Sequence, residues 1–200
     1  TFLLTALMVS CVSDDFVDVR QLNQINSENY FNTEEDYELA VIGAYDLLQT
    51  TYLNSMLGEM ASDNTLAGGE NANDVPAFQE IDDMNHNVVN DQLRNIWNWM
   101  YAGINRTNYI FEFRDKTDFE GKNEILAETA FLRAYYYFEL VKFFGDVPMP
   151  IDKRVQFGEE SNYPRVPKAQ VYAQIESDLS FAIENLPVTQ EQNGRVTKGA

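Results

Sequence analysis

Apolar residues recur at helical spacing in four stretches of the chain, and polar or Gly- and Pro-containing segments separate these stretches. The first follows Thr33, a residue type that favours the N-cap, and the acidic run Glu34 to Asp36 suits the positive end of a helix dipole. Its apolar stripe is Tyr37, Val41, Ala44, Tyr45 and Leu48. We therefore expect an amphipathic helix ending near Gln49, and a short second helical piece over residues 53–60.

The second stretch begins at Asp91 and predicts a helix that reaches Phe113. One face of this helix carries Leu93, Trp97, Met100, Ile104, Asn108 and Phe111. The third stretch begins near Lys122, directly after Gly121. Two long helices joined by so short a link are expected to pack as an antiparallel pair, which indicates a helical-repeat scaffold.

The third helix is expected to be central to the fold. Ala127, Ala130 and Ala134 leave one of its faces almost bare, so a neighbouring helix can approach closely there. The run Tyr135 to Tyr137 lies among other bulky residues and is interpreted as core in preference to a ligand-stacking surface. The helix is expected to end at about Phe144, because the following Gly145-Asp146-Val147-Pro148 contains a glycine cap and a proline.

The fourth stretch follows an irregular segment at residues 151–166 and has Pro167 as its expected first helical residue. Its stripe is Val171, Ile175, Leu179, Ala182 and Leu186, and Pro187 ends it. The predicted fold class is therefore mainly all-α, built from helical pairs with long irregular loops.

Residues 61–90 differ from the helical stretches, since Gly68, Gly69 and Pro76 interrupt any period and asparagines are frequent. A long loop of this kind either carries binding residues or is a mobile surface loop. Amide side chains both donate and accept hydrogen bonds, and Phe or His offers a flat face, so the segment suits a neutral, hydroxyl-rich ligand. The candidate ligand-binding residues are Asn64, Asn73, Phe78, Gln79, Asn85 and His86.

Charge and residue counts exclude several function classes. The net charge of −18, from 32 acidic and 14 basic residues, repels phosphate backbones, so nucleic-acid binding is disfavoured. One cysteine and one histidine cannot build a zinc site or an internal disulfide, and no metal or cofactor is predicted. The carboxylate pairs Asp82-Asp83 and Glu159-Glu160 are interpreted as solvated surface rather than as glycosidase acids. These observations favour a protein that is not an enzyme.

The start of the chain carries an apolar run from Phe2 to Val9, which has the length of a signal-peptide core and is too short to span a bilayer. The following Met8-Val9-Ser10-Cys11 is similar to a bacterial lipobox, although Met replaces the usual Leu. Residues 1–10 are therefore predicted to be a partial signal peptide, and residues 11–29 a tether lipidated at Cys11. The alternative is a buried structural cysteine.

Several motifs occur together and in order. After Cys11 come Trp97-x-x-x-Tyr101-x-x-Ile104-x-x-x-Asn108, Ala130-Phe131-Leu132-Arg133-Ala134-Tyr135-Tyr136-Tyr137, Phe144-Gly145-Asp146-Val147-Pro148, Arg165-Val166-Pro167, Val171-Tyr172-x-x-Ile175-x-x-Asp178-Leu179 and Gly194-Arg195-Val196-Thr197-Lys198-Gly199-Ala200. This series resembles the SusD/RagB family and covers nearly the whole chain.

The resemblance implies tetratricopeptide-like helical pairs and a lipid anchor on the outer face of the outer membrane. It implies non-catalytic capture of oligosaccharides, or in some branches peptides, and their delivery to a SusC-like TonB-dependent transporter. Family members are usually more than twice as long, so residues 30–200 are expected to be the N-terminal part of the domain, with Thr197 capping a helix that lies beyond Ala200. The alternative is a helical scaffold lipoprotein that binds a protein or peptide partner and recognises no glycan.

Overall fold

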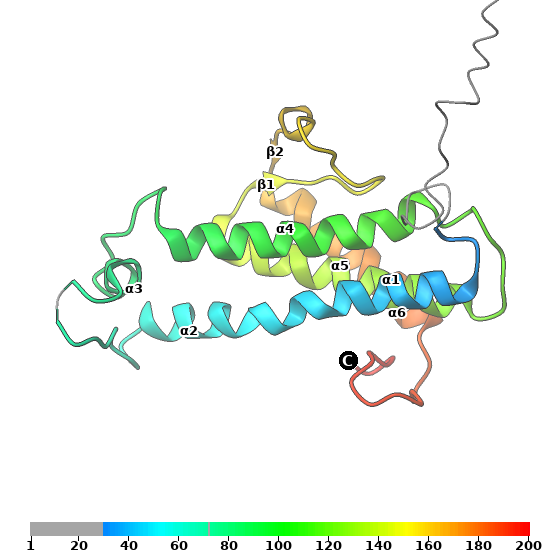
Figure 1. Cartoon of the computed structure of the whole chain (residues 1–200), viewed down its shortest axis with the longest axis horizontal. Helices are drawn as coiled ribbons and strands as arrows, with labels where there is room; N and C mark the ends of the chain where they lie inside the picture. The colour runs from blue at the N-terminus through cyan, green and yellow to red at the C-terminus, as the bar shows by residue number, and fades with distance from the viewer. Residues whose placement is uncertain (1–29, 72) are drawn as a thin grey trace, which may run out of the picture. The chain divides into compact units, whose positions relative to one another are not determined.

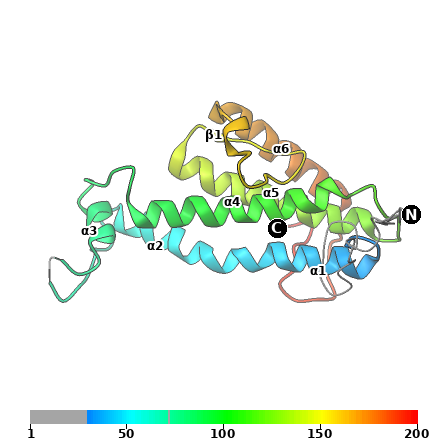
Figure 2. The same ribbon diagram turned by 45° about the horizontal axis from the view of Figure 1, so that its top comes forward.

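The two longest helices, α4 (Asp91–Glu112) and α5 (Lys122–Phe144), form the predicted antiparallel pair (Figure 1). Helix α6 (Lys168–Asn185) packs along α5, and α1 (Glu34–Tyr45) contacts both α4 and α5 from another side (Figure 2). The computed structural model describes residues 30–71 and 73–200, and Phe31–Ala200 form one unit. The predicted signal peptide, Cys11 and the tether up to residue 29 lie outside the described residues.

Helix α1 begins where the sequence predicts. It ends at Tyr45, and helical backbone continues past Gln49 in two further elements. Thr33 caps it: the Asp36 backbone N–H donates to the Thr33 hydroxyl at 3.3 Å, and the Thr33 N–H donates to the Asp36 carboxylate at 2.9 Å. The 3₁₀ helix η2 (Asp46–Thr51) then joins α1 to α2 (Tyr52–Met60). Threonine hydroxyls in η2 donate to carbonyls three residues earlier, which favours this tighter turn.

The expectation of a long loop over residues 61–90 is wrong in one part, because α3 (Pro76–Asp82) lies within it. Pro76 occupies the first helical position, where its missing N–H leaves no hydrogen bond unmade, so it starts a helix rather than interrupting one. Ile81 is the buried residue of this short helix. The Asn90 amide donates to Ala77 O at 2.9 Å and to Glu80 Oε2 at 2.8 Å. Because Asn90 also caps α4, it ties α3 to the start of α4.

Helix α5 is buried on several sides, as its sequence predicts. The alanine face is covered: Ala127 packs with Ala182, Leu186 and Val196. Tyr136 and Tyr137 are fully buried and their hydroxyls donate to backbone carbonyls, so the prediction that this run is core is confirmed for these two residues, whereas Tyr135 is half-buried. Helices α4 and α5 lie close together at Gly103, where an added Cβ would lie 2.5 Å from the Tyr136 ring.

The segment between α5 and α6 contains the only strands of the described residues. Gly145, at φ +65°, ends α5, and β1 (Val147–Pro148) then pairs antiparallel with β2 (Arg165–Val166). The 3₁₀ helix η3 (Glu160–Asn162) lies between them. Pro167 has extended backbone and precedes α6, so the helix begins one residue later than predicted. The mainly all-α fold class is confirmed, and no described helix has the length and apolarity needed to cross a membrane.

Candidate ligand-binding site

Side chains from α4 and α5 hold residues 147–155, which comprise β1 and the irregular backbone that follows it, in place. The Tyr101 hydroxyl donates to Pro148 O at 2.7 Å, and the Asn108 amide and the Tyr137 hydroxyl donate to Pro150 O at 2.7 Å and 2.6 Å. Backbone carbonyls outside helices and sheets need such partners when they are buried. Residues of the sequence motifs therefore fix the path of this segment over α4.

Arg133 is the buried centre of the same network. Its guanidinium forms two hydrogen bonds with Asp178 of α6, at 2.8 Å and 2.7 Å, and donates to Asn108 Oδ1 at 3.2 Å and to Ile151 O at 2.8 Å. The guanidinium carbon lies 4.1 Å from the centre of the Phe111 ring. Arg133 is buried and bonded within the protein, so it joins α4, α5, α6 and residue 151 and is not available to a ligand.

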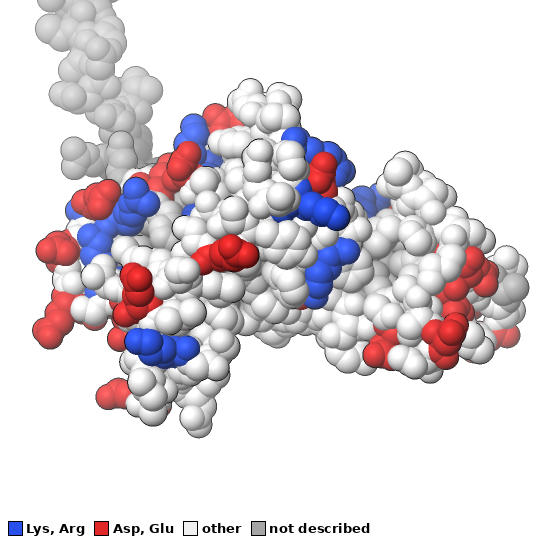
Figure 3. Space-filling model, turned by 180° about the vertical axis from the view of Figure 1, so that it is seen from behind, with Lys and Arg blue, Asp and Glu red and all other residues white. Residues whose placement is uncertain are grey.

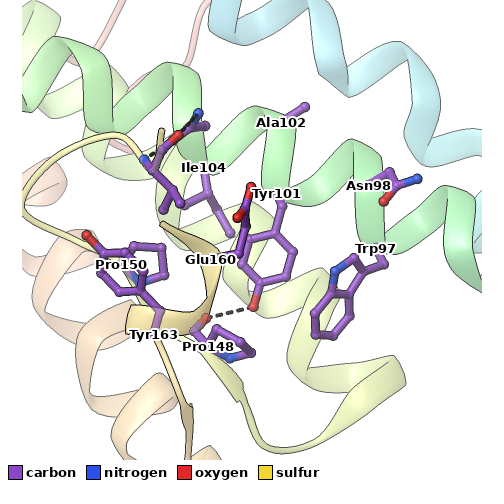
Figure 4. A pocket seen from close by; sticks show the side chains of 11 residues that line it. Trp97, Asn98, Tyr101, Ala102, Ile104, Pro148, Pro150, Glu160 and Tyr163 are labelled. Atoms are coloured by element: carbon purple, nitrogen blue, oxygen red, sulfur yellow. Dashed lines mark hydrogen bonds between the residues drawn. The ribbon is translucent and has the colours of Figure 1, made fainter. Parts of the chain in front are cut away.

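A cavity of about 330 Å³ lies between α4 and the segment that this network fixes (Figure 4). We call it the tyrosine pocket. Its α4 wall is Trp97, Asn98, Tyr101, Ala102, Ile104 and Asn105, and its opposite wall is Pro148, Pro150, Val155, Glu160 and Tyr163. Figure 4 shows the Trp97 and Tyr101 rings extending from α4 toward Pro148 and the Glu160 carboxylate beside the Tyr101 ring.

Some polar groups of the tyrosine pocket serve the fold and others are free for a ligand. Asn105 exchanges two hydrogen bonds with the Val155 backbone, at 3.1 Å and 2.6 Å, and Tyr101 is bonded to Pro148. Burial raises the pKa of Tyr101 well above its ordinary value, so the hydroxyl stays protonated and can donate. Within the described part of the chain, the side chains of Asn98 and Glu160 make no hydrogen bond, and they can accept or donate to a ligand.

A second cavity, of about 540 Å³, is also lined by Trp97. We call it the arginine pocket. It is lined by residues 86–89, by Leu93, Arg94 and Trp97 of α4, and by Phe144 and Arg165. Trp97 belongs to both pockets: its ring centre is 4.8 Å from that of Tyr101 and 5.1 Å, edge to face, from that of Phe144.

The structure brings one of the six predicted binding residues, His86, to the wall of the arginine pocket. Asn64, Asn73 and Asn85 are exposed, and Phe78 and Gln79 are half-buried on α3. The Asn73 N–H donates to Asn71 Oδ1 at 2.9 Å, and the Gln79 amide donates to Asn71 O at 3.4 Å, so both contribute to the local structure. These five residues line neither of the two pockets around Trp97.

Sequence reasoning missed the pocket residues of α4 and β2. The sequence pattern assigns Trp97 to an apolar stripe. Because Trp97 and Tyr101 are four residues apart, their aromatic rings are expected on the same side of the helix, and this spacing is a signal for the site. Arg165 carried no signal, because its place beside Trp97 depends on the pairing of β2 with β1.

Charge is distributed unevenly around the site. Residues 21–93 contain no Lys or Arg, and acidic side chains gather at the end of the molecule that carries α3 (Figure 3). Among the described residues no group of His, Cys, Asp or Glu side chains has the arrangement of a metal site. The arginine pocket thus lies where basic residues adjoin an acidic part of the molecule.

Comparisons with known proteins agree on one group of relatives. A family model named SusD-like, described as starch-binding and associating with the outer membrane, matches residues 15–200. SusD-like protein P38 of Formosa agariphila is 28% identical over 193 residues, covering 94% of this chain and 37% of that relative. The chain thus spans less than two fifths of the length of that relative.

Solved structures give the same result. A laminarin-binding SusD-like protein superposes with a TM-score of 0.74 at 29% identity, covering 84% of this chain and 38% of the other. Surface glycan-binding protein A from Bacteroides uniformis superposes with a TM-score of 0.73 at 27% identity, covering 84% of this chain and 39% of the other. The helical fold is therefore shared with both proteins.

Proposed function

Because the chain belongs to the SusD-like family, whose model matches residues 15–200, we propose that it binds an oligosaccharide at the cell surface and delivers it to a SusC-like TonB-dependent transporter. The observation that carries the proposal is this match, whose description is starch-binding at the outer membrane. The two structural relatives support it, since one is a laminarin-binding protein and the other a surface glycan-binding protein.

The chemistry of the two pockets around Trp97 fits a saccharide. Sugar rings present flat apolar faces that pack on aromatic side chains, and their hydroxyls need both donors and acceptors. Trp97 supplies the flat face, and Asn98 and Glu160 supply free polar atoms at the tyrosine pocket. His86, from the segment 61–90, lines the arginine pocket together with Trp97. The other predicted residues remain candidates for contacts with a longer ligand: Asn64, Asn73, Phe78, Gln79 and Asn85.

Binding without catalysis is the form of the proposal that the site favours. Glycoside hydrolysis in most families uses two carboxyl groups on either side of the scissile bond. Glu160 is the one carboxylate that lines the tyrosine pocket, and the described residues of the arginine pocket include none. We therefore propose capture and transfer of the saccharide, with its glycosidic bonds left intact.

Attachment to the outer membrane is proposed to run through Cys11 at the start of the tether 11–29, after removal of residues 1–10. A cysteine with two or more acyl chains anchors a protein stably. In this arrangement residues 30–200 face the cell exterior. The variant Cys11→Ala is expected to be released from membranes in cell fractionation, and its continued membrane retention would contradict the anchor.

Isothermal titration of the full-length protein against laminarin oligosaccharides, other oligosaccharides and peptides tests the binding function. We expect heat of binding with at least one saccharide and no sugar release when the protein is incubated with it. If no saccharide gives heat of binding while the protein still binds the transporter, the scaffold alternative is favoured. Release of shorter sugars would contradict the non-catalytic proposal.

A further inference from the structure

Arg165 stands apart from the other arginines of the described chain. Arg94, Arg106, Arg114, Arg133, Arg154 and Arg195 each pair with a carboxylate. Arg165 pairs with no carboxylate among the described residues, although the chain carries 32 acidic residues against 14 basic ones. Within the described chain, no carboxylate therefore competes with an anionic ligand for the Arg165 guanidinium.

The position of Arg165 directs it to the arginine pocket. It lies on β2 opposite Pro148, is exposed, and has its guanidinium carbon 5.2 Å from the centre of the Trp97 ring. One nitrogen donates to Asp146 O, which orients the group. A guanidinium has five N–H donors in a planar fork, so donors remain for a ligand.

The rest of the pocket wall adds donors and apolar surface. Arg94 lies on α4 and pairs with Asp91, but both side chains are exposed, at 62% and 64%, so this pair is weakly held. The His86 ring is exposed and makes no hydrogen bond to the described residues. Phe144 and Trp97 supply aromatic surface, and no residue that lines the pocket is acidic.

We propose that the arginine pocket binds an acidic sugar unit, a uronate or a sulfated sugar, of the saccharide that the protein captures. The guanidinium fork of Arg165 takes the anionic group, Arg94 adds a second positive charge, and the sugar ring packs against Trp97. A cavity of about 540 Å³ has the size of a small-ligand site. The inference rests on the proposed saccharide binding and names the class of saccharide.

Titration of the full-length protein with acidic oligosaccharides and their neutral counterparts tests the proposal. The probes are oligogalacturonate, oligomannuronate and oligoglucuronate with their methyl esters, and sulfated galactan oligosaccharides with their desulfated forms. We expect at least one acidic form to bind about tenfold more tightly than its neutral form, because hydrogen bonds to a charged group are stronger than those to a neutral one. The uronate and sulfate arms distinguish the two sources of charge.

The outcomes separate this proposal from the function on which it rests. Binding of neutral saccharides that equals or exceeds binding of the acidic forms would overturn the acidic pocket and leave saccharide capture standing. Binding of no saccharide, acidic or neutral, would overturn both. Binding of the acidic forms alone supports both.

The variant Arg165→Gln assigns the effect to one side chain. We expect it to weaken binding of the acidic form about tenfold and to leave binding of the neutral form unchanged, whereas Arg165→Lys retains part of the preference. The matched control is Arg114→Gln, an exposed arginine paired with Asp115 at 3.6 Å and absent from both pockets. An equal loss for acidic and neutral forms would contradict the proposed role of Arg165.

Discussion

Two asparagines of α4, Asn108 and Asn98, show how differently the two halves of this helix are used. Asn108 is fully buried, donates to Pro150 O at 2.7 Å and accepts from Arg133 at 3.2 Å. Asn98, about three turns earlier in the same helix, is exposed and lines the tyrosine pocket without a hydrogen bond to the described residues. The same side chain is part of the fold in one place and available to a ligand in the other.

The contrast extends to the surroundings of each residue. Around Asn108 lies what we call the packing region, in which Arg133 pairs with Asp178 and donates to Ile151 O, and the Tyr137 hydroxyl donates to Pro150 O. Around Asn98 lies the pocket region, in which Trp97 separates two cavities. We infer that changes in the packing region alter stability, and changes in the pocket region alter binding.

The largest expected effect is in the packing region. Arg133→Met leaves Asp178 buried without its cation and Ile151 O without a donor, so we expect the free energy of unfolding to fall by about 3–5 kcal/mol. Urea denaturation measures the loss. The control Arg114→Met breaks an exposed pair with Asp115 and should cost about 1 kcal/mol or less. Similar losses for the two variants would contradict the distinction between buried and exposed arginines.

The next effect tests the close contact of α4 with α5. Gly103→Ala places a methyl group 2.5 Å from the Tyr136 ring, and overpacking of this kind costs about 1–3 kcal/mol. Gly43→Ala in α1 is the matched control, because nothing lies within 4 Å of its added Cβ and alanine favours helix. We expect thermal unfolding to show a lowered midpoint for Gly103→Ala only. A lowered midpoint for Gly43→Ala alone would be the contrary result.

Much of the packing region could be predicted from sequence. The start of α4 and both ends of α5 follow from Asn90, Gly121 and Gly145, because caps and helix breakers act over a few residues. The burial of Tyr136 and Tyr137 follows from the apolar residues on nearly all sides of α5. Helix α3 was missed because Pro76 was interpreted as a breaker, although proline also favours the first turn of a helix.

The pocket region could not be predicted in the same way. Trp97, Glu160 and Arg165 are brought together by β-pairing and by side-chain bonds to irregular backbone, and these contacts are distant in sequence. His86 was identified by its residue type in a polar segment. Local patterns therefore predict the helices, while the site depends on tertiary contacts that no local pattern records.

A smaller effect is the pH dependence of stability that Glu128, a buried carboxyl group of α5, is expected to cause. Burial raises the pKa of Glu128, against the opposing effects of the Tyr45 hydroxyl, which donates to it at 2.6 Å, and of Arg195. A raised pKa in the folded state means that the stabilisation is complete below the ordinary value of 4.5 and is lost as pH rises through the folded-state pKa.

We therefore expect the wild-type protein to lose stability relative to Glu128→Gln as pH rises from 4.5. Urea midpoints of both proteins, measured between about pH 4 and pH 8, give the difference. A difference that is independent of pH, or that changes in favour of the wild type as pH rises, would contradict the raised pKa.

The smallest effect on stability belongs to the pocket region. Asn98→Ala removes an exposed amide that bonds to no described residue, so we expect a change in the free energy of unfolding within about 0.5 kcal/mol. In contrast, Asn108→Ala leaves Pro150 O without one donor and should cost about 1–3 kcal/mol. Equal urea midpoints for the two variants would contradict the claim that changes in the packing region affect stability more than changes in the pocket region.

The central claim is that saccharide binding takes place around Trp97, and titration of the variant Trp97→Ala in the full-length protein tests it most directly. The ligand is the saccharide that the wild-type protein binds, and the comparison is the double variant Asn64→Ala with Asn73→Ala, which removes two candidate contacts that line neither pocket. We expect Trp97→Ala to weaken binding about tenfold or more, because it removes the aromatic ring that lines both pockets. Unchanged affinity for Trp97→Ala, with a loss in the double variant, would contradict the account and place binding in the segment 61–90.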